Sequence, residues 1–400
     1  LLYGIVHLYL FKGIITKSSY GTLSHEAQYI MNYTFMIFNL FIYTYIFKNE
    51  ENTEKLRKSL LFANAIYIIS IFIAIITNTS SSTYIEKIGY KGWFEQGNTI
   101  GAILILSLFV IIKYIDDKEK RKLAISIILM EGIYLTFLLG TRTGLLGFIF
   151  VVICYVLSEI TINILKKGKI NKKTIIGGTA VVAIILLFII TFGSTTFQRR
   201  KHLKDIEDNI YDNTQNQKSH ITGSLLEIKE KIDNGTLEEG YMTEAQQKTI
   251  IELYNICNKL NISNNDQRSQ QLIYNTLQVK NQKNIMYILF GNGYVSNFRE
   301  LVLEMEIPAF LFNFGIIGFI LYFIPFFAIF IYGIYIGIKN IKNIDRNYLM
   351  TLIGSGFVFV LSFLAGYTFF NSSSMIIIVV VNTLLLNEIK KVNIKRKDIL

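Results

Sequence analysis

Long apolar runs follow one another along this chain. Most of them approach about 20 residues, the length at which a helix crosses a hydrocarbon layer roughly 30 Å thick. Because backbone N–H and C=O groups find no partners in lipid, such runs form helices whose backbone hydrogen bonds are all internal. Charged residues make up 17% of the chain, against about 25% in an average soluble domain. The sequence therefore predicts an all-α, polytopic membrane protein.

The apolar runs divide into about ten predicted spans. We place them at residues 1–16, 28–47, 59–78, 98–114, 123–141, 143–164, 174–193, 309–336, 347–369 and 374–389. The first run is already apolar at Leu1, and no Met precedes it. We therefore expect that one or more N-terminal helices are missing from this sequence.

Lysine and arginine gather in the short segments between these runs, and five such segments hold 22 of the 40 Lys and Arg residues. These segments are 48–58, 113–122, 166–173, 339–346 and 390–397. All five fall on one side when the ten spans alternate, which is typical of cytoplasmic loops. The same count places the long polar loop between the seventh and eighth spans on the extracytoplasmic face.

We predict four parts in the chain. They are a seven-span bundle at 1–193, the loop at 194–308, the last spans at 309–391 and a basic cytoplasmic tail at 392–400. The loop holds 13 Lys and Arg against 15 Asp and Glu, so the chain's net charge of +11 does not indicate nucleic-acid binding.

The loop is predicted to be mostly helical. Thr243-Glu-Ala-Gln246 has the pattern of a capping box, and apolar residues then recur at helical spacing. Asp266 is placed to cap a second helix that extends to about Lys280, with Arg268 in its first turn. A large ordered loop over a helical bundle is a natural place for a reaction centre.

Arg142 lies in Gly140-Thr-Arg-Thr-Gly144, where one span ends and the next begins. A charge costs little at the membrane interface, so a simple anchoring role is possible for a lone arginine. Arginine is unusual at extracytoplasmic span ends, and this favours a functional role.

Four motifs, spread over roughly residues 85–325, resemble those of the O-antigen ligase/polymerase superfamily, which includes the Wzy-like polymerases. They are Gly92-Trp-Phe-Glu-Gln-Gly-Asn98 before a span, Arg142-x-x-x-Leu146 at a span start, Arg268 followed by Gly291-Asn-Gly293, and the segment from Glu304 to Gly315-Ile-Ile-Gly318. The resemblance implies a fold similar to type-C glycosyltransferases. It also implies residence in a bacterial plasma membrane, with the large loop outside the cell.

The resemblance further implies a reaction. A glycan would pass from an undecaprenyl-diphosphate carrier to the hydroxyl of a glycan or lipid-linked acceptor, without a metal or other cofactor. The implied partners are this donor, the acceptor and membrane lipids, and nucleic acid is not among them. Such a reaction needs cations for the leaving diphosphate and a base for the acceptor hydroxyl.

The hypothesis assigns Arg142 and Arg268 to the diphosphate and Glu304 to the acceptor hydroxyl as catalytic residues. Further substrate contacts are expected from Asn98, Glu306, Gly291, Gly293, Arg199 and Arg200. Residues that are two positions apart on a helix point in different directions, so Glu304 and Glu306 are not expected to face one site together.

Each assignment has a simpler structural alternative. Glu304 would then belong to a solvated acidic rim, and Arg268 would form an ordinary ion pair with Asp266. Gly291 and Gly293 would form a tight turn. Arg199 and Arg200 would belong to a solvated basic patch.

Two positions depart from the superfamily pattern. Glu304 stands where ligases carry a histidine, and Asn313 stands where the superfamily usually has a glutamate. The variant looks closer to a Gram-positive branch and favours a polymerase over a ligase. The four histidines and two cysteines form no metal-ligand pattern.

Two other classes of function are compatible with a polytopic chain. A lipid-linked oligosaccharide flippase is expected to show inverted repeats and several charged or broken helices at the membrane midplane. A non-catalytic membrane scaffold is the second alternative. Within the spans we find one ionisable suspect, Glu131, for which a hydrogen bond inside the bundle is the simpler explanation.

Overall fold

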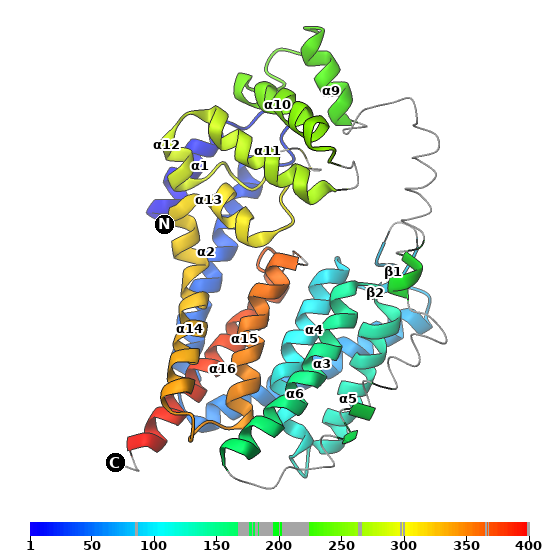
Figure 1. Cartoon of the computed structure of the whole chain (residues 1–400), viewed down its shortest axis with the longest axis vertical. Helices are drawn as coiled ribbons and strands as arrows, with labels where there is room; N and C mark the ends of the chain where they lie inside the picture. The colour runs from blue at the N-terminus through cyan, green and yellow to red at the C-terminus, as the bar shows by residue number, and fades with distance from the viewer. Residues whose placement is uncertain are drawn as a thin grey trace. The chain divides into compact units, whose positions relative to one another are not determined.

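The computed structural model describes residues 1–84, 87–166, 176–177, 179–180, 183, 195–199, 201, 224–262, 266–296, 298, 301–364, 366 and 368–397. The regular elements within these residues are helices, apart from one short pair of strands. It forms two compact units (Figure 1). Unit 1 contains Leu1–Phe35 and Glu207–Pro325, and unit 2 contains Met36–Ile206 and Phe326–Leu400. The four-part division made from the sequence stays a prediction.

Unit 1 combines the start of the chain with the polar loop. Its helices are α1 (Leu2–Lys12), the first half of α2 (Leu23–Ile46), α9 (Ser224–Asp233), α10 (Glu244–Leu260), α11 (Gln267–Gln282), α12 (Ile285–Phe290) and α13 (Glu306–Tyr322). The described part of the loop is therefore mostly helical, as predicted.

Helices α10 and α11 pack together around the apolar core of unit 1. Leu253 and Cys257 from α10 meet Tyr274 and Leu277 from α11, and Leu301 closes the same cluster. Burial of these side chains stabilises the fold by about 25 cal/mol for each Å² of apolar surface that is removed from water. This core fixes the position of the chain that follows α11.

Both predicted caps are confirmed. Thr243 and Gln246 form a reciprocal capping box at the start of α10. The Asp266 carboxylate accepts the backbone N–H of Ser269 and begins α11. Each cap satisfies backbone donors that a helix start leaves free.

Helix α13 is interrupted at Gly315. This residue has φ 68° and ψ −178°, which is non-helical and open to few residues other than glycine. The break frees carbonyl groups that a continuous helix would have used internally. These carbonyls become partners for a turn described below.

Unit 2 is the larger helical bundle. It contains the second half of α2, α3 (Glu50–Ile76), β1 (Ser81–Ser82), β2 (Tyr90–Gly92), α4 (Gly97–Ile111), the 3₁₀ turn η1 (Ile112–Ile115), α5 (Arg121–Ile133), the π-helical turn η2 (Tyr134–Leu138), α6 (Arg142–Leu165), most of α14 (Ile324–Lys339), α15 (Arg346–Leu364) and α16 (Ser372–Lys397). The two strands pair antiparallel in the connection that leads to α4.

Helix α4 lies inside unit 2 and contacts α3, α6, α15 and α16 (Figure 1). Within the apolar segment formed by α4 and η1, 83% of the most hydrophobic 18-residue stretch is buried. A helix that is apolar on all sides is one that other helices surround. The ends of α4 therefore mark two opposite ends of the bundle.

Five helical segments are long and apolar enough to cross a membrane among the residues that the structure describes. They are α3, α4 with η1, α6, α15 and α16, and the bent pair α13 and α14 makes a sixth if it counts as one span. These segments confirm a polytopic membrane protein. The number of ten spans stays a prediction.

Four of the predicted spans, at 1–16, 28–47, 123–141 and 174–193, are not among these segments. The run at 1–16 forms α1, which has 11 residues in this sequence. The predicted span at 174–193 lies almost wholly outside the described residues.

Candidate functional site

Arg268 and Glu304, two of the predicted catalytic residues, meet in unit 1. The Arg268 Nε donates to Glu304 Oε2 at 3.4 Å. Their side chains are 43% and 37% exposed. Arg268 thus forms an ion pair, with Glu304 as the partner in place of the Asp266 considered from the sequence. Asp266 instead caps the helix.

One face of α11 holds the segment that carries Glu304. The Gln271 side chain accepts the Glu304 N–H at 3.1 Å, and Asn275 Nδ2 donates to the Leu301 carbonyl at 3.2 Å. With Arg268 these residues lie at i, i+3 and i+7, on one face of a helix. The Glu304 backbone is therefore held in place, while its carboxylate stays accessible to solvent.

Glu306 has a different environment from Glu304. It is the first residue of α13, and its side chain is fully buried. The two carboxylates therefore do not share one surface, as the spacing argument predicted. Glu306 is expected to affect the site through packing, and direct contact with substrate stays a prediction.

Gly291 and Gly293 form a turn against the break in α13. Their φ angles are 87° and 84°, in the region that favours glycine. The Asn292 N–H donates to Phe312 O at 3.0 Å, and the Gly293 N–H donates to Asn313 O at 2.9 Å. The turn thus takes the carbonyls that Gly315 leaves free, which supports the tight-turn interpretation of the two glycines.

A buried pair from the start of the chain holds the other side of this turn. His7 Nε2 lies 2.8 Å from Glu26 Oε1, and neither side chain is exposed. The Glu26 carboxylate also accepts the N–H groups of Tyr294 and Val295, at 2.9 and 3.1 Å. His7 and Glu26 therefore position the turn that precedes Glu304.

This pair was not predictable from the sequence. His7 was placed in a membrane span, and Glu26 was not singled out. The available signal was the presence of two ionisable residues next to apolar runs, where an unpaired charge is unfavourable. Nothing in the spacing of residues 7 and 26 indicates that they meet.

Arg142, the third predicted catalytic residue, begins α6 in unit 2 and is exposed. Thr141 caps this helix, and its Oγ1 accepts the Gly144 N–H at 3.0 Å. The turn before it is fixed by Thr83, whose hydroxyl donates to Leu139 O at 2.7 Å. The expected place of Arg142 at a helix start is confirmed.

Helices α4 and α6 run parallel, so their N-termini lie at the same end of unit 2. A Cβ on Gly101 would lie 4.0 Å from Thr141 Oγ1, and one on Gly147 would meet Ile105 further along. Asn98 lies in the first turn of α4 and is half-buried. The structure thus brings Asn98 and Arg142 to neighbouring helix starts.

Arg199 joins the same end of unit 2. Thr196, three residues before it, donates its hydroxyl to Thr141 O at 3.4 Å. The Arg199 guanidinium lies 3.4 Å from the centre of the Tyr84 ring, an arrangement that attracts a cation to an aromatic face. Its Nε has no hydrogen-bond partner within the described residues. Arg200 lies outside them.

A family model described as O-antigen ligase like membrane protein matches residues 1–392. The chain belongs to this family. No curated protein and no solved structure matched it in the comparisons made. The match covers both units, including every residue assigned above to the predicted site.

The O-antigen ligase-like family is an enzyme family. Within the described residues, no group of three His, Cys, Asp or Glu side chains is placed to hold a metal ion. The described side chains of the predicted site offer arginine cations and one partly exposed carboxylate base, Glu304. Arg142 and Arg199 lie at one end of unit 2, and Arg268 lies beside the Glu304 carboxylate in unit 1.

Proposed function

We propose that this protein is a membrane glycosyltransferase that polymerises or ligates undecaprenyl-diphosphate-linked oligosaccharide units on the extracytoplasmic face. The observation that carries the proposal is the contact between Arg268 and Glu304. The Arg268 guanidinium on α11 and the Glu304 carboxylate, which are the cation and the base that the proposal requires, lie in direct contact. Family membership supports the class of substrate.

The leaving group of this reaction is a diphosphate, which gains negative charge as the glycosidic bond breaks. Helix N-termini carry partial positive charge and favour phosphate. Unit 2 offers the starts of α4 and α6 together, with Arg142 and Arg199 beside them. Guanidinium groups suit phosphate because their donors form a fixed fork. We assign the donor diphosphate to this group.

The acceptor hydroxyl must lose a proton as its oxygen attacks the anomeric carbon. We assign the proton to the Glu304 carboxylate. The new carbon–oxygen bond forms while the bond to the carrier diphosphate breaks, and the diphosphate leaves with the electron pair. Arg268 is assigned to stabilise this charge, as electrostatic groups do most effectively when they are positioned before the reaction.

The ion pair does not prevent this use of Glu304. Both side chains are about two-fifths exposed, and exposed ion pairs contribute only about 0–1 kcal/mol. An incoming substrate can therefore open the contact with little loss of stability. We favour polymerisation over ligation because Glu304 replaces the histidine that ligases carry at this position.

The test is conversion of undecaprenyl-diphosphate repeat units by the purified full-length chain, read as the formation of longer glycans. We expect Arg142→Ala, Arg268→Ala and Glu304→Gln each to lower the rate at least about 100-fold, the scale of losing one electrostatic or acid–base group. Full activity in all three variants would show that the assignment is wrong.

Two matched controls separate chemistry from structure. Arg121 is an exposed arginine at the first position of α5, as Arg142 is in α6, and Lys259 is an exposed cation on α10. Arg121→Ala and Lys259→Ala should keep the activity. A protein that moves the lipid-linked donor across vesicles without forming a new glycosidic bond would instead be a flippase.

A further inference from the structure

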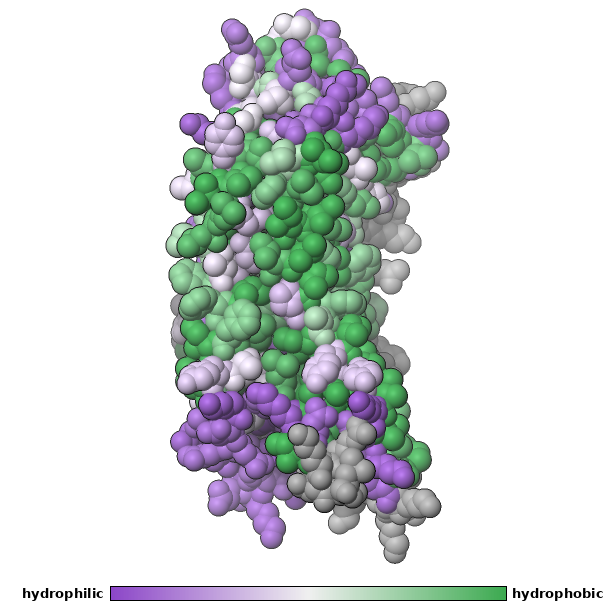
Figure 2. All heavy atoms as spheres, turned by 90° about the vertical axis from the view of Figure 1, so that its left-hand side faces the viewer, coloured by the Kyte–Doolittle hydropathy of each residue, from purple (hydrophilic) through white to green (hydrophobic). Residues whose placement is uncertain are grey.

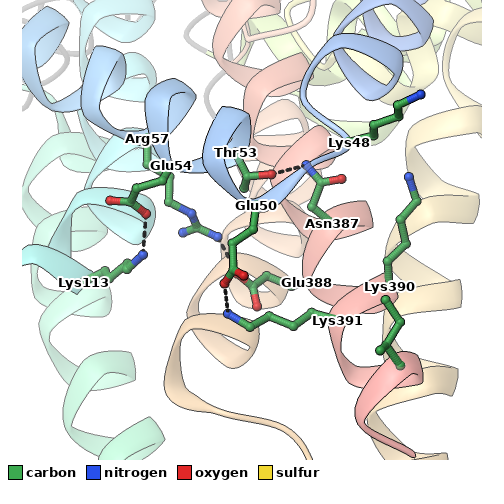
Figure 3. A pocket seen from close by; sticks show the side chains of 11 residues that line it. Lys48, Glu50, Thr53, Glu54, Arg57, Lys113, Asn387, Glu388, Lys390 and Lys391 are labelled. Atoms are coloured by element: carbon green, nitrogen blue, oxygen red, sulfur yellow. Dashed lines mark hydrogen bonds and ion pairs between the residues drawn. The ribbon is translucent and has the colours of Figure 1, made fainter. Parts of the chain in front are cut away.

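A polar pocket of about 350 Å³ opens at one end of unit 2, where α3, η1 and α16 meet (Figure 3). Its lining residues are Lys48, Glu50, Thr53, Glu54, Arg57, Lys113, Asn387, Glu388, Lys390, Lys391 and Ile394. Asn98 lies in the first turn of α4 and Lys113 follows its end, so the pocket lies at the opposite end of the bundle from Arg142. It is separate from the site proposed above for the donor diphosphate.

Three ion pairs account for all three carboxylates that line the pocket. Arg57 donates to Glu388 at 2.6 Å, Lys113 lies 2.7 Å from Glu54, and Lys391 lies 3.1 Å from Glu50. Within each pair the positive and the negative charge cancel. They leave two of the five cations in the pocket without a carboxylate.

The two remaining cations are Lys48 and Lys390. Figure 3 shows them on one side of the pocket, apart from the ion pairs. Lys48 lies 4.7 Å from the centre of the Tyr45 ring, and neither lysine has an acidic partner among the described side chains. Two exposed, uncompensated ammonium groups beside one cavity attract an anion.

Asn387 adds a second, uncharged requirement. Its Nδ2 donates to Phe47 O at 2.7 Å and to Thr53 Oγ1 at 3.1 Å, which fixes the orientation of the amide. Its Oδ1 is buried and has no partner within the described residues. A buried acceptor without a donor is unfavourable, so a ligand that supplies a hydroxyl is favoured here.

The surface next to the pocket is apolar. Phe41 and Tyr45, four residues apart on α2, are 69% and 72% exposed, and Lys48 lies three residues after Tyr45. Ile394, which lines the pocket, is also exposed. Figure 2 shows the same change on the face it displays, where hydrophobic side chains give way to hydrophilic ones towards the lower end. Lysines at such a border lie at headgroup depth.

We propose that this pocket binds the headgroup of an anionic phospholipid that carries a free hydroxyl, as phosphatidylglycerol does. The phosphate lies between Lys48 and Lys390, a glycerol hydroxyl donates to Asn387 Oδ1, and an acyl chain follows the exposed face of α2. A soluble phosphate ester has the same polar groups but no acyl chain to cover the apolar surface. The lipid is therefore the occupant that matches all three features.

The experiment is native mass spectrometry of the full-length chain in detergent, titrated with dioctanoyl phosphatidylglycerol. We expect binding that the double variant Lys48→Ala/Lys390→Ala weakens roughly 30-fold, since each basic residue near an anionic lipid contributes on the order of a fivefold factor. The matched control is Lys122→Ala/Lys342→Ala, two exposed lysines that do not line the pocket. The control should bind as the unchanged chain does.

Three other ligands test the remaining parts of the proposal. Dioctanoyl phosphatidylethanolamine lacks net charge, and dioctanoyl phosphatidylmethanol has the charge of phosphatidylglycerol but no free hydroxyl, so both should bind more weakly. Glycerol 3-phosphate should bind much more weakly because it has no acyl chains. Equal binding of phosphatidylglycerol by the pocket variant and the control variant overturns the site. If glycerol 3-phosphate binds as tightly as phosphatidylglycerol does, the proposal that a lipid occupies the pocket is overturned.

Discussion

The guanidinium of Arg57 on α3 donates to the carboxylate of Glu388 on α16 over 2.6 Å, and only 2% and 9% of these side chains are exposed. Removal of one partner leaves a buried, unpaired charge. We expect Arg57→Met or Glu388→Gln to lower the free energy of unfolding by about 3–5 kcal/mol. The measurement is equilibrium unfolding of the purified chain in detergent.

The double variant Arg57→Met/Glu388→Leu is the control for this prediction. It removes both charges and leaves neither unpaired, and such replacements are often neutral in protein interiors. Its stability should therefore exceed that of either single variant. A loss equal to the sum of the two single losses would mean that Arg57 and Glu388 act independently and that the contact is not energetically coupled.

A charge exchange tests whether the pair of Arg268 and Glu304 has a role beyond structure. Because both side chains are partly exposed, Arg268→Glu/Glu304→Arg should change the free energy of unfolding by less than about 1 kcal/mol. The exchanged pair retains an ion pair but moves the base and the cation to each other's positions. Glycan formation should fall at least about 100-fold.

Two readouts are needed to interpret the exchanged pair. Unchanged stability with lost activity indicates that each residue acts at its own position. Restored activity in the exchanged variant, after inactive single variants, would instead make the contact a purely structural ion pair. Unfolding in detergent and the polymerisation assay distinguish these results.

The turn at Gly291 gives a third prediction. A Cβ at this position would lie 2.1 Å from the Asn313 carbonyl oxygen, a backbone atom that cannot move aside easily. Gly291→Ala should therefore separate the turn from α13 and destabilise unit 1 by several kcal/mol, since overpacking alone typically costs about 1–3 kcal/mol and the positive φ adds to it.

Gly240→Ala is the matched control for the turn. Gly240 also has a positive φ, of 73°, but a Cβ there would have no neighbour within 4 Å. This variant reports the backbone penalty alone, about 1–2 kcal/mol. If Gly291→Ala were no more harmful than Gly240→Ala in limited proteolysis of the purified chain, the close packing of turn and helix would be contradicted.

Local features of this fold were predictable from the sequence. The capping box at Thr243, the cap at Asp266 and the helix start at Arg142 depend on residues within a few positions of each other, and all three are confirmed. The same holds for the different environments of Glu304 and Glu306. Apolar runs likewise identify a membrane protein, because the length of each run carries the signal.

Contacts between distant segments were not predictable. The pair of His7 and Glu26 and the pair of Arg57 and Glu388 join residues whose spacing carries no periodic signal. The break at Gly315 was missed for a related reason. A glycine in an apolar helix indicates a break only when a partner for the freed carbonyls is known, and that partner lies at Gly293.

Cys257 gives a prediction about pH. Its side chain is fully buried in the core of unit 1, and this burial, together with the nearby Asp266 carboxylate, raises the pKa of its thiol from 9.0 to about 11. The folded chain therefore keeps the thiol proton up to a higher pH than the unfolded chain does. Between about pH 9 and pH 11 the unfolded state binds fewer protons, so the stability of the fold decreases as the pH rises through this window.

The variant Cys257→Ala lacks the titrating group and should show a smaller decrease. Unfolding of both proteins from pH 7 to pH 11 measures the difference between their slopes, which removes the contribution of the tyrosines and lysines that they share. Parallel slopes would mean that the thiol has the same pKa in both states, and that its burial does not persist in solution.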